Sequence, residues 1–330
     1  MSFIFITGSG RSGTTLMRCL LDGNSGLSVY PAEVSGFLEM FLEQSGYAST
    51  IEIAQSSGAL LQQFLPEQDD LATWNELKER MVKAFDAKGR RTAPELLEAL
   101  TAAKGLTLLD VTTPNLAGYL DVFQGSKVIH MIRHPFDTLN SQFRLRFADP
   151  NSFGGSHPGH WPFTDAFERV QRSFAAAARY QDHERVKLVR LEDLQSNPKK
   201  VMADVMDFLD LQLEPINLGQ TKDGKDFAGN STRTPAMNVV KQNHDWSCLT
   251  KNDLSLASRL PHVGEFYDIP HFPTCKNQIG PFLARTFGFK GKERPTLRSP
   301  KKFLQLIPIS LSHYMQDLAY KAALESELKE

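Results

Sequence analysis

The sequence has few cysteines, no excess of charge and no long apolar run. Its three cysteines lie far apart and form no CxxC pair, which excludes a disulfide framework and a cysteine zinc motif and favours a reducing compartment. Because 37 Lys and Arg are balanced by 38 Asp and Glu, a general nucleic-acid binder, which is normally basic, is not indicated. No apolar stretch is long enough to span a membrane, and the N-terminus does not resemble a signal peptide. We therefore expect a cytoplasmic protein without a transmembrane segment.

The pattern that is present is that of an α/β fold. The 330 residues are 41% hydrophobic, which allows a full-sized core. Nearly continuous apolar runs predict buried parallel strands at Phe3–Thr7, Leu106–Val111, Lys127–Ile132 and Val186–Arg190. Apolar periodicity and first-turn prolines predict helices at Thr14–Asp22, Leu71–Ala87, Pro94–Ala103, Pro114–Phe123, Pro135–Phe147, Phe163–Glu184 and Pro198–Leu209. This alternation predicts three layers, with a central, mainly parallel sheet flanked by helices.

A glycine-rich turn follows the first predicted strand directly. Residues Gly8–Thr15 read GSGRSGTT and lead into an amphipathic helix. Glycines let backbone N–H groups converge, and the helix dipole favours negative charge, so this turn predicts an anion-binding site of the phosphate type. The spacing from Gly8 to Gly13 fits a P-loop, but Thr14 stands where a nucleoside triphosphatase has lysine. The cation lies inside the turn instead, at Arg11.

Two segments carry a resemblance to a known family. Residues Phe5–Arg18 (FITGSGRSGTTLMR) resemble the 5′-phosphosulfate loop of sulfotransferases that use 3′-phosphoadenosine 5′-phosphosulfate (PAPS), and are most similar to the branch that includes protein-tyrosine and many bacterial sulfotransferases. Residues Lys127–Ser141 (KVIHMIRHPFDTLNS) resemble the family's 3′-phosphate segment, in which a strand ends in arginine and serine follows eight residues later. The guanidinium of Arg133 and the hydroxyl of Ser141 suit one phosphate group. The resemblance extends over about residues 3–268.

The resemblance implies a P-loop-type fold and PAPS as co-substrate, with no metal. The residues that it implies for the donor are Gly10, Arg11, Ser12, Gly13, Thr14, Thr15, Arg133 and Ser141. Arg11 is expected to act in catalysis as well, because its guanidinium can straddle the phosphosulfate. Residues 1–270 are expected to form this PAPS-binding domain, and residues 271–330 a C-terminal extension that ends in a helix.

The sequence departs from the family's pattern in the segment before the second motif. Many relatives carry a lysine there that helps to neutralise the transferred sulfuryl group, whereas this chain has Thr112. A hydroxyl can form a hydrogen bond but supplies no charge. That charge is then expected from Arg11, from Arg18, or from Arg144 or Arg146.

The acceptor needs a base within hydrogen-bond reach of its proton. In the tyrosine-sulfating branch this base is a glutamate shortly after the first helix, and Glu33 takes that place here. The alternative for Glu33 is a carboxylate that caps the start of a helix. Cytosolic small-molecule sulfotransferases use a histidine near the position of Thr112, where this chain has none. His134 is expected on the nucleotide side.

The sequence thus favours a sulfotransferase that transfers a sulfuryl group to a hydroxyl or amine acceptor by in-line displacement. The acceptor can be a small molecule, a carbohydrate or a peptide, and no nucleic-acid partner is expected. Two alternatives stay open: a P-loop kinase, disfavoured by the missing lysine, and a nucleotide-binding protein without activity, for which Thr112 argues.

Overall fold

The computed structural model describes residues 3–33, 108–111, 115–123, 125–148, 163–222, 225–226, 246, 249, 251–270 and 272. They belong to two compact units. Unit 1 comprises Met1–Ile132 and Arg179–Lys241, and unit 2 comprises Arg133–Ala178 and Gln242–Glu330. The helices predicted at Leu71–Ala87 and Pro94–Ala103 lie outside the described residues, and so does nearly all of the extension predicted over 271–330. The predicted domain boundary at residue 270 therefore stays a prediction.

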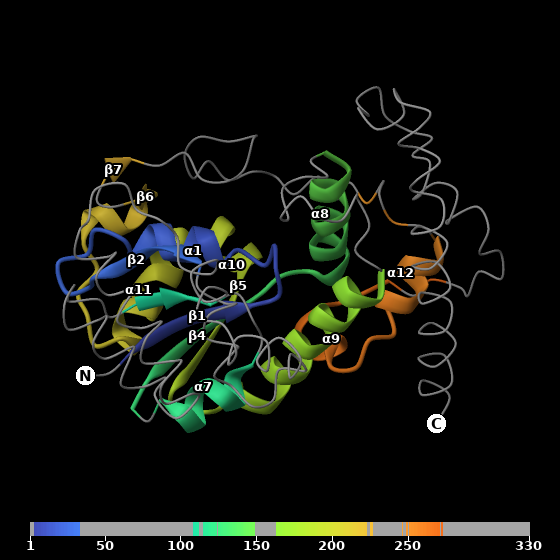
Figure 1. Cartoon of the computed structure of the whole chain (residues 1–330), viewed down its shortest axis with the longest axis horizontal. Coiled ribbons are helices and arrows are strands. Elements are labelled where there is room, and N and C mark those ends of the chain that lie inside the picture. The colour runs from blue at the N-terminus through green and yellow to red at the C-terminus, as the bar shows by residue number, and fades with distance from the viewer. Residues whose placement is uncertain are drawn as a thin grey trace, which may run out of the picture. The chain divides into compact units, whose positions relative to one another are not determined.

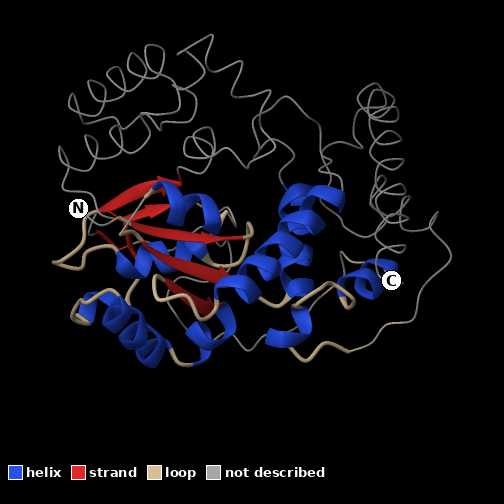
Figure 2. Ribbon diagram, turned by 90° about the horizontal axis from the view of Figure 1, so that it is seen from below, coloured by secondary structure: helices blue, strands red, loops and turns tan. Residues whose placement is uncertain are grey.

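Unit 1 is built on a sheet of five parallel strands in the order β2-β3-β1-β4-β5. Figures 1 and 2 show these strands as one sheet with helices on both faces. The predicted α/β fold with a central parallel sheet is confirmed, and four of the strands lie within two residues of the predicted ones. The strands are β1 (Ile4–Gly8), β2 (Val29–Glu33), β3 (Leu108–Asp110), β4 (Lys127–Ile132) and β5 (Val186–Arg190).

The sequence does not predict β2. Its middle residue is Pro31, which has no N–H for a ladder hydrogen bond and is rare in central strands. β2 lies at the edge of the sheet beside β3, and its register shifts between Val29 and Glu33. An edge position with an irregular register tolerates proline, which explains how this segment can pair although its sequence resembles a turn.

Among the described residues, α1, α10 and α11 cover one face of the sheet and α7 covers the other (Figure 1). Ile4 and Ile6 of β1 pack with apolar side chains of α1, α10 and α11. On the other face, Phe5 stacks on Tyr119 of α7 with ring centroids 5.0 Å apart. Burying side chains of this size contributes roughly 1.5–3 kcal/mol each, so both faces hold β1 in place. The helices are α1 (Thr14–Leu21), α7 (Leu116–Val122), α10 (Leu191–Ser196) and α11 (Pro198–Phe208).

Two helix starts show how the chain fixes these boundaries. α11 begins with Pro198, as predicted, because proline suits the first helical turn. α7 begins two residues after the predicted Pro114, since Asn115 is its N-cap and accepts a hydrogen bond from the Gly118 amide at 3.2 Å.

A buried amide network anchors the C-terminal end of α1. Asn217, in the 3-10 helix η2 (Pro215–Leu218), donates from Nδ2 to the Leu20 carbonyl at 2.9 Å. Its Oδ1 accepts a hydrogen bond from Asn24 Nδ2 at 2.9 Å. Each bond of this kind contributes about 1 kcal/mol, and breaking one leaves a buried polar group unpaired. The network therefore fixes the end of α1 that points away from the glycine-rich turn. The two-stranded sheet of β6 (Thr221–Lys222) and β7 (Lys225–Asp226) follows η2.

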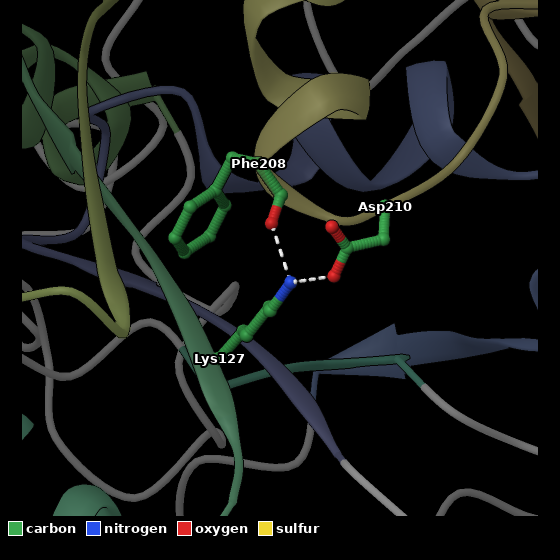
Figure 3. Close-up of polar contacts among 3 residues, drawn as sticks. All are labelled: Lys127, Phe208 and Asp210. Carbon is green, nitrogen blue, oxygen red and sulfur yellow. Dashed lines mark hydrogen bonds and ion pairs between the residues drawn. The ribbon is translucent and has the colours of Figure 1, made fainter.

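At the amino edge of the sheet, Lys127 joins the start of β4 to the end of α11 (Figure 3). Its Nζ donates to the Phe208 carbonyl at 2.6 Å and to the Asp210 carboxylate. Asp210 has a left-handed backbone, with φ of 59°. Its amide and the next one, that of Leu211, donate to the Asp207 and Met206 carbonyls, which closes the helix end in a Schellman-type motif.

Unit 2 contains α8 and an aromatic core. Phe136 of α8 lies edge-on to Trp246, with ring centroids 4.8 Å apart, and Trp246 Nε1 donates to Asp137 Oδ1 at 2.8 Å. The fully buried Phe174 packs near Tyr267, at 6.0 Å between centroids. The helices are α8 (Pro135–Ala148), α9 (Phe163–Tyr180, in this unit up to Ala178), α12 (Lys251–Ala257) and α13 (Val263–Phe266). The predicted helix Phe163–Glu184 thus ends four residues early, at Tyr180.

Candidate active site

The glycine-rich turn links the end of β1 to the start of α1. At Gly8, a Cβ atom would lie 2.4 Å from the Met131 carbonyl oxygen and 2.5 Å from Ser12 Oγ. At Gly13 the backbone φ is 104°, and a Cβ atom would lie 2.8 Å from a methyl carbon of Leu191. Neither position accepts a side chain, so glycine is required for the turn to pack this closely against β4 and α10.

Backbone amides converge at the N-terminus of α1. The first helical hydrogen bond runs from the Met17 amide to the Gly13 carbonyl at 3.0 Å, so the amides from Gly13 to Leu16 precede the helical ladder. The Ser12 amide donates to the Ser9 carbonyl at 3.0 Å and closes the turn itself. The Ser12 hydroxyl is buried and has no hydrogen-bond partner among the described residues. The helix N-terminus with its partial positive charge thus has the features of an anion-binding site.

Arg11 lies in this turn and has a backbone conformation that residues other than glycine rarely adopt. Its φ is 74°, in the left-handed region, and its side chain is partly exposed. A residue other than glycine costs roughly 1–2 kcal/mol in that region. Strain of this kind gathers at functional sites, and here it occurs at the arginine that the sequence predicts to bind the donor.

The carboxyl ends of the strands bring further predicted residues to the same edge of the sheet. Glu33 is the last residue of β2 and lies opposite Asp110, the last residue of β3. Asp110 in turn lies opposite Ile6, two residues before the turn begins. Glu33 thus ends a strand, and the residues that follow it lie outside the described part of the chain, so its role as a base and the helix-capping alternative both stay predictions. Thr112 lies outside the described residues.

Arg18, which the sequence offers as a source of positive charge, forms a buried ion pair. Its Nε lies 3.5 Å from Asp110 Oδ2, and the two side chains are 7% and 1% exposed. Buried charges are stable only when paired, so this arginine neutralises the end of β3 from the middle of α1. The next residue, Cys19, is buried as well, and its burial raises the pKa of the thiol although the Arg18 charge lowers it.

Arg133 and Ser141 lie in unit 2, on the segment that leads from β4 into α8. Both side chains are partly exposed. The start of α8 is fixed by Thr138, whose Oγ1 donates to the His134 carbonyl at 3.2 Å. The structure places Arg133 just before α8 and Ser141 inside it, as predicted, and their closure on one phosphate stays a prediction.

The His134 ring belongs to the aromatic core of unit 2. It stacks on Trp246 with ring centroids 5.7 Å apart and an interplanar angle of 8°, and it meets Tyr267 edge-on at 5.4 Å. The sequence did not connect Trp246 with the start of α8, because 109 residues separate it from its partner Asp137. The only hint in the sequence is that the N–H of a buried tryptophan usually has a hydrogen-bond acceptor.

Two possible features are not found within the described part of the chain. None of its helices is both long and apolar enough to cross a membrane. In the same residues, no group of three or more His, Cys, Asp and Glu side chains could hold a metal ion.

The chain is similar to known proteins in both sequence and fold. A family model described as "Sulfotransferase family" matches residues 3–215, more than half of the chain. Among solved structures, the sulfotransferase domain from the Synechococcus PCC 7002 olefin synthase is similar in fold, with a TM-score of 0.55 and 22% identity over 82% of this chain and 96% of that one.

Two further solved structures are less similar. The sulfotransferase domain from the curacin biosynthetic pathway has a TM-score of 0.44 and 20% identity over 88% of this chain and 98% of that one. A sulfotransferase from Mycobacterium avium has a TM-score of 0.37 and 15% identity over 65% of each chain. Comparison with curated protein sequences gave no match.

Proposed function

The chain belongs to the sulfotransferase family, and from that premise we propose that it takes its sulfuryl group from PAPS and passes it to a hydroxyl or amine acceptor in the cytoplasm. The observation that supports this most is the turn between β1 and α1. It combines a helix N-terminus, a left-handed arginine and two glycines that the packing requires. Such a turn binds a doubly charged group like the phosphosulfate without the lysine of a nucleoside triphosphatase.

The donor residues divide between the two ends of the nucleotide. The amides of Gly13 to Thr15 and the guanidinium of Arg11 bind the 5′-phosphosulfate, with the neighbouring Gly10 and Ser12 shaping the turn. Arg133 and Ser141 bind the 3′-phosphate. Because sulfuryl transfer resembles phosphoryl transfer, positioning and charge stabilisation supply most of the rate acceleration.

The transfer itself is one displacement at sulfur. The acceptor oxygen attacks the sulfur in line while the bond from sulfur to the bridging phosphate oxygen breaks, and adenosine 3′,5′-bisphosphate (PAP) leaves with the electron pair. The acceptor proton passes to the Glu33 carboxylate. The place of Glu33 at the carboxyl end of β2, on the edge where the turn begins, supports this role.

Calorimetric titration with PAP and with ATP–Mg²⁺ tests the donor. We expect PAP to bind and ATP–Mg²⁺ to bind at least about tenfold more weakly, a difference of 1.4 kcal/mol. Binding of ATP–Mg²⁺ alone would contradict the proposal and favour a P-loop kinase. Incubation with ³⁵S-labelled PAPS and cell extracts then tests transfer, and binding of PAP with no labelled product and no PAPS hydrolysis would favour a nucleotide-binding protein without activity.

A further inference from the structure

An arginine other than Arg11 lies at the edge of the sheet that carries the glycine-rich turn. Arg190 is the last residue of β5 and lies opposite Ile132, the last residue of β4. Parallel strands all end at the same edge, so Arg190 belongs to the edge that carries the turn. Ligands of open α/β sheets bind outside the carboxyl ends of the strands, which makes a charged residue at this position a candidate for ligand contact.

The neighbour of Arg190 places it next to the N-terminus of α1. A methyl carbon of Leu191 lies only 2.8 Å from where a Cβ atom of Gly13 would be, and Leu191 is 5% exposed. Leu191 therefore packs on Gly13, the N-cap of α1. Because consecutive Cα atoms are about 3.8 Å apart, the backbone of Arg190 lies close to this contact. Gly13 begins the run of amides that the anion would bind.

The Arg190 side chain is partly exposed at this edge of the sheet. It is 39% exposed, and its Nε lies 3.7 Å from Asp193 Oδ2 in the first turn of α10. The Asp193 side chain is itself 56% exposed, and an ion pair so open to water contributes little to stability. An exposed pair of this kind does not neutralise the guanidinium as a buried pair would.

The proposed donor site needs positive charge that two candidate positions do not supply. Thr112 supplies no charge where many relatives have lysine, and Arg18 is buried against Asp110. We propose that Arg190 contacts the 5′-phosphosulfate of the donor beside the N-terminus of α1 and provides positive charge that Thr112 cannot. This inference rests on the proposed function, and it concerns one residue of the same site.

Calorimetry with PAP and with 5′-AMP tests it, on the wild type and on Arg190→Met, Arg190→Lys and Arg185→Met. Arg185 is the matched control: it precedes β5 at the opposite edge of the sheet, where its guanidinium donates to the Leu120 carbonyl at 3.3 Å. We expect Arg190→Met to weaken both ligands by about tenfold, since both carry the 5′-phosphate, with Arg190→Lys between it and the wild type. Arg185→Met should bind both ligands like the wild type. Melting curves confirm that each variant is folded.

The outcomes separate this inference from the function on which it rests. If the wild type does not bind PAP, the proposed function fails. If the wild type binds PAP and Arg190→Met binds it equally well, the role of Arg190 is wrong and the function stands. A loss for PAP alone would place Arg190 at the 3′-phosphate and overturn the assignment. An equal loss in Arg185→Met would show an effect of net charge and would also overturn it.

Discussion

The two edges of the unit 1 sheet both carry a left-handed residue and charged side chains, yet they differ in what those groups do. At the amino edge, Asp210 closes the end of α11, and Lys127 bonds to it and to the Phe208 carbonyl. At the carboxyl edge, Arg11 is left-handed inside a turn that ends no helix. The first arrangement ends a helix, whereas the left-handed Arg11 belongs to the Ser9–Ser12 turn that leads into the N-terminus of α1, where we propose that the donor binds. Substitutions at the two edges test this contrast.

Glu33→Gln should slow transfer by roughly 10²–10⁴, the usual contribution of a positioned base, because it keeps the shape of the side chain and removes its basicity. Donor affinity should barely change. Single-turnover transfer from prebound PAPS, with any acceptor that the labelled extracts identify, measures the rate. A wild-type rate in Glu33→Gln together with its loss in His134→Ala would show that the base lies on the nucleotide side instead.

Arg18→Met should lower the free energy of unfolding by about 3–5 kcal/mol, since it leaves the buried Asp110 carboxylate without its partner. Urea unfolding gives the value. The double variant Arg18→Met/Asp110→Asn removes the uncompensated charge and should recover much of the loss. A cost below about 1 kcal/mol for the single variant would mean that the ion pair is as weak as an exposed one.

Arg11→Gly should weaken PAP binding by the equivalent of about 1.5–3 kcal/mol, the contribution of charge-assisted hydrogen bonds. Stability should stay the same or rise by up to about 1 kcal/mol, because glycine removes the left-handed strain at some entropic cost. Asp210→Gly is the matched control: it removes the same type of strain at the other edge and should leave PAP affinity unchanged. Wild-type PAP affinity in Arg11→Gly would refute the assignment of Arg11.

Arg133→Ala should erase most of the preference for PAP over 5′-AMP, which we expect to be at least about tenfold, or 1.4 kcal/mol, in the wild type. The two nucleotides differ only in the 3′-phosphate, so competition between them isolates that contact. Equal affinities in the wild type would contradict both the pairing of Arg133 with Ser141 and the family's mode of binding in this chain.

Lys127→Met should have the smallest effect, a loss of about 1 kcal/mol of stability with no change in PAP affinity. Its Nζ makes one hydrogen bond to a carbonyl and one ion pair to a carboxylate that is 85% exposed, and exposed pairs contribute little. Thermal melting and calorimetry measure the two quantities. A clear loss of PAP affinity would contradict the claim that the amino edge has no part in binding the donor.

The sequence predicts the parts of this site that are local and misses those that depend on distant partners. The strand, turn and helix from Ile4 to Leu21 follow from apolar runs and glycines, and the structure shows them as predicted. β2 was missed because Pro31 hides an edge strand that only its pairing with β3 reveals.

Charge partners across the sheet are equally hidden from the sequence. Arg18 and Asp110 are 92 positions apart, and no spacing rule connects them. In the sequence, Arg190 is only the last residue of a predicted strand. The packing of Leu191 on Gly13 shows that it lies near the turn. The class of reaction could thus be predicted from the sequence, whereas the proposed contribution of Arg190 depends on the fold.

Hydrogen–deuterium exchange with and without PAP tests the central claim, that the carboxyl edge binds the donor, without needing an acceptor. The account predicts slower exchange at the amides from Gly13 to Leu16 on addition of PAP, and unchanged exchange at the Asp210 and Leu211 amides of the amino edge, which already have acceptors in the protein. Saturating PAP that leaves exchange at Gly13 to Leu16 unchanged, or that protects only the amino edge, would contradict it.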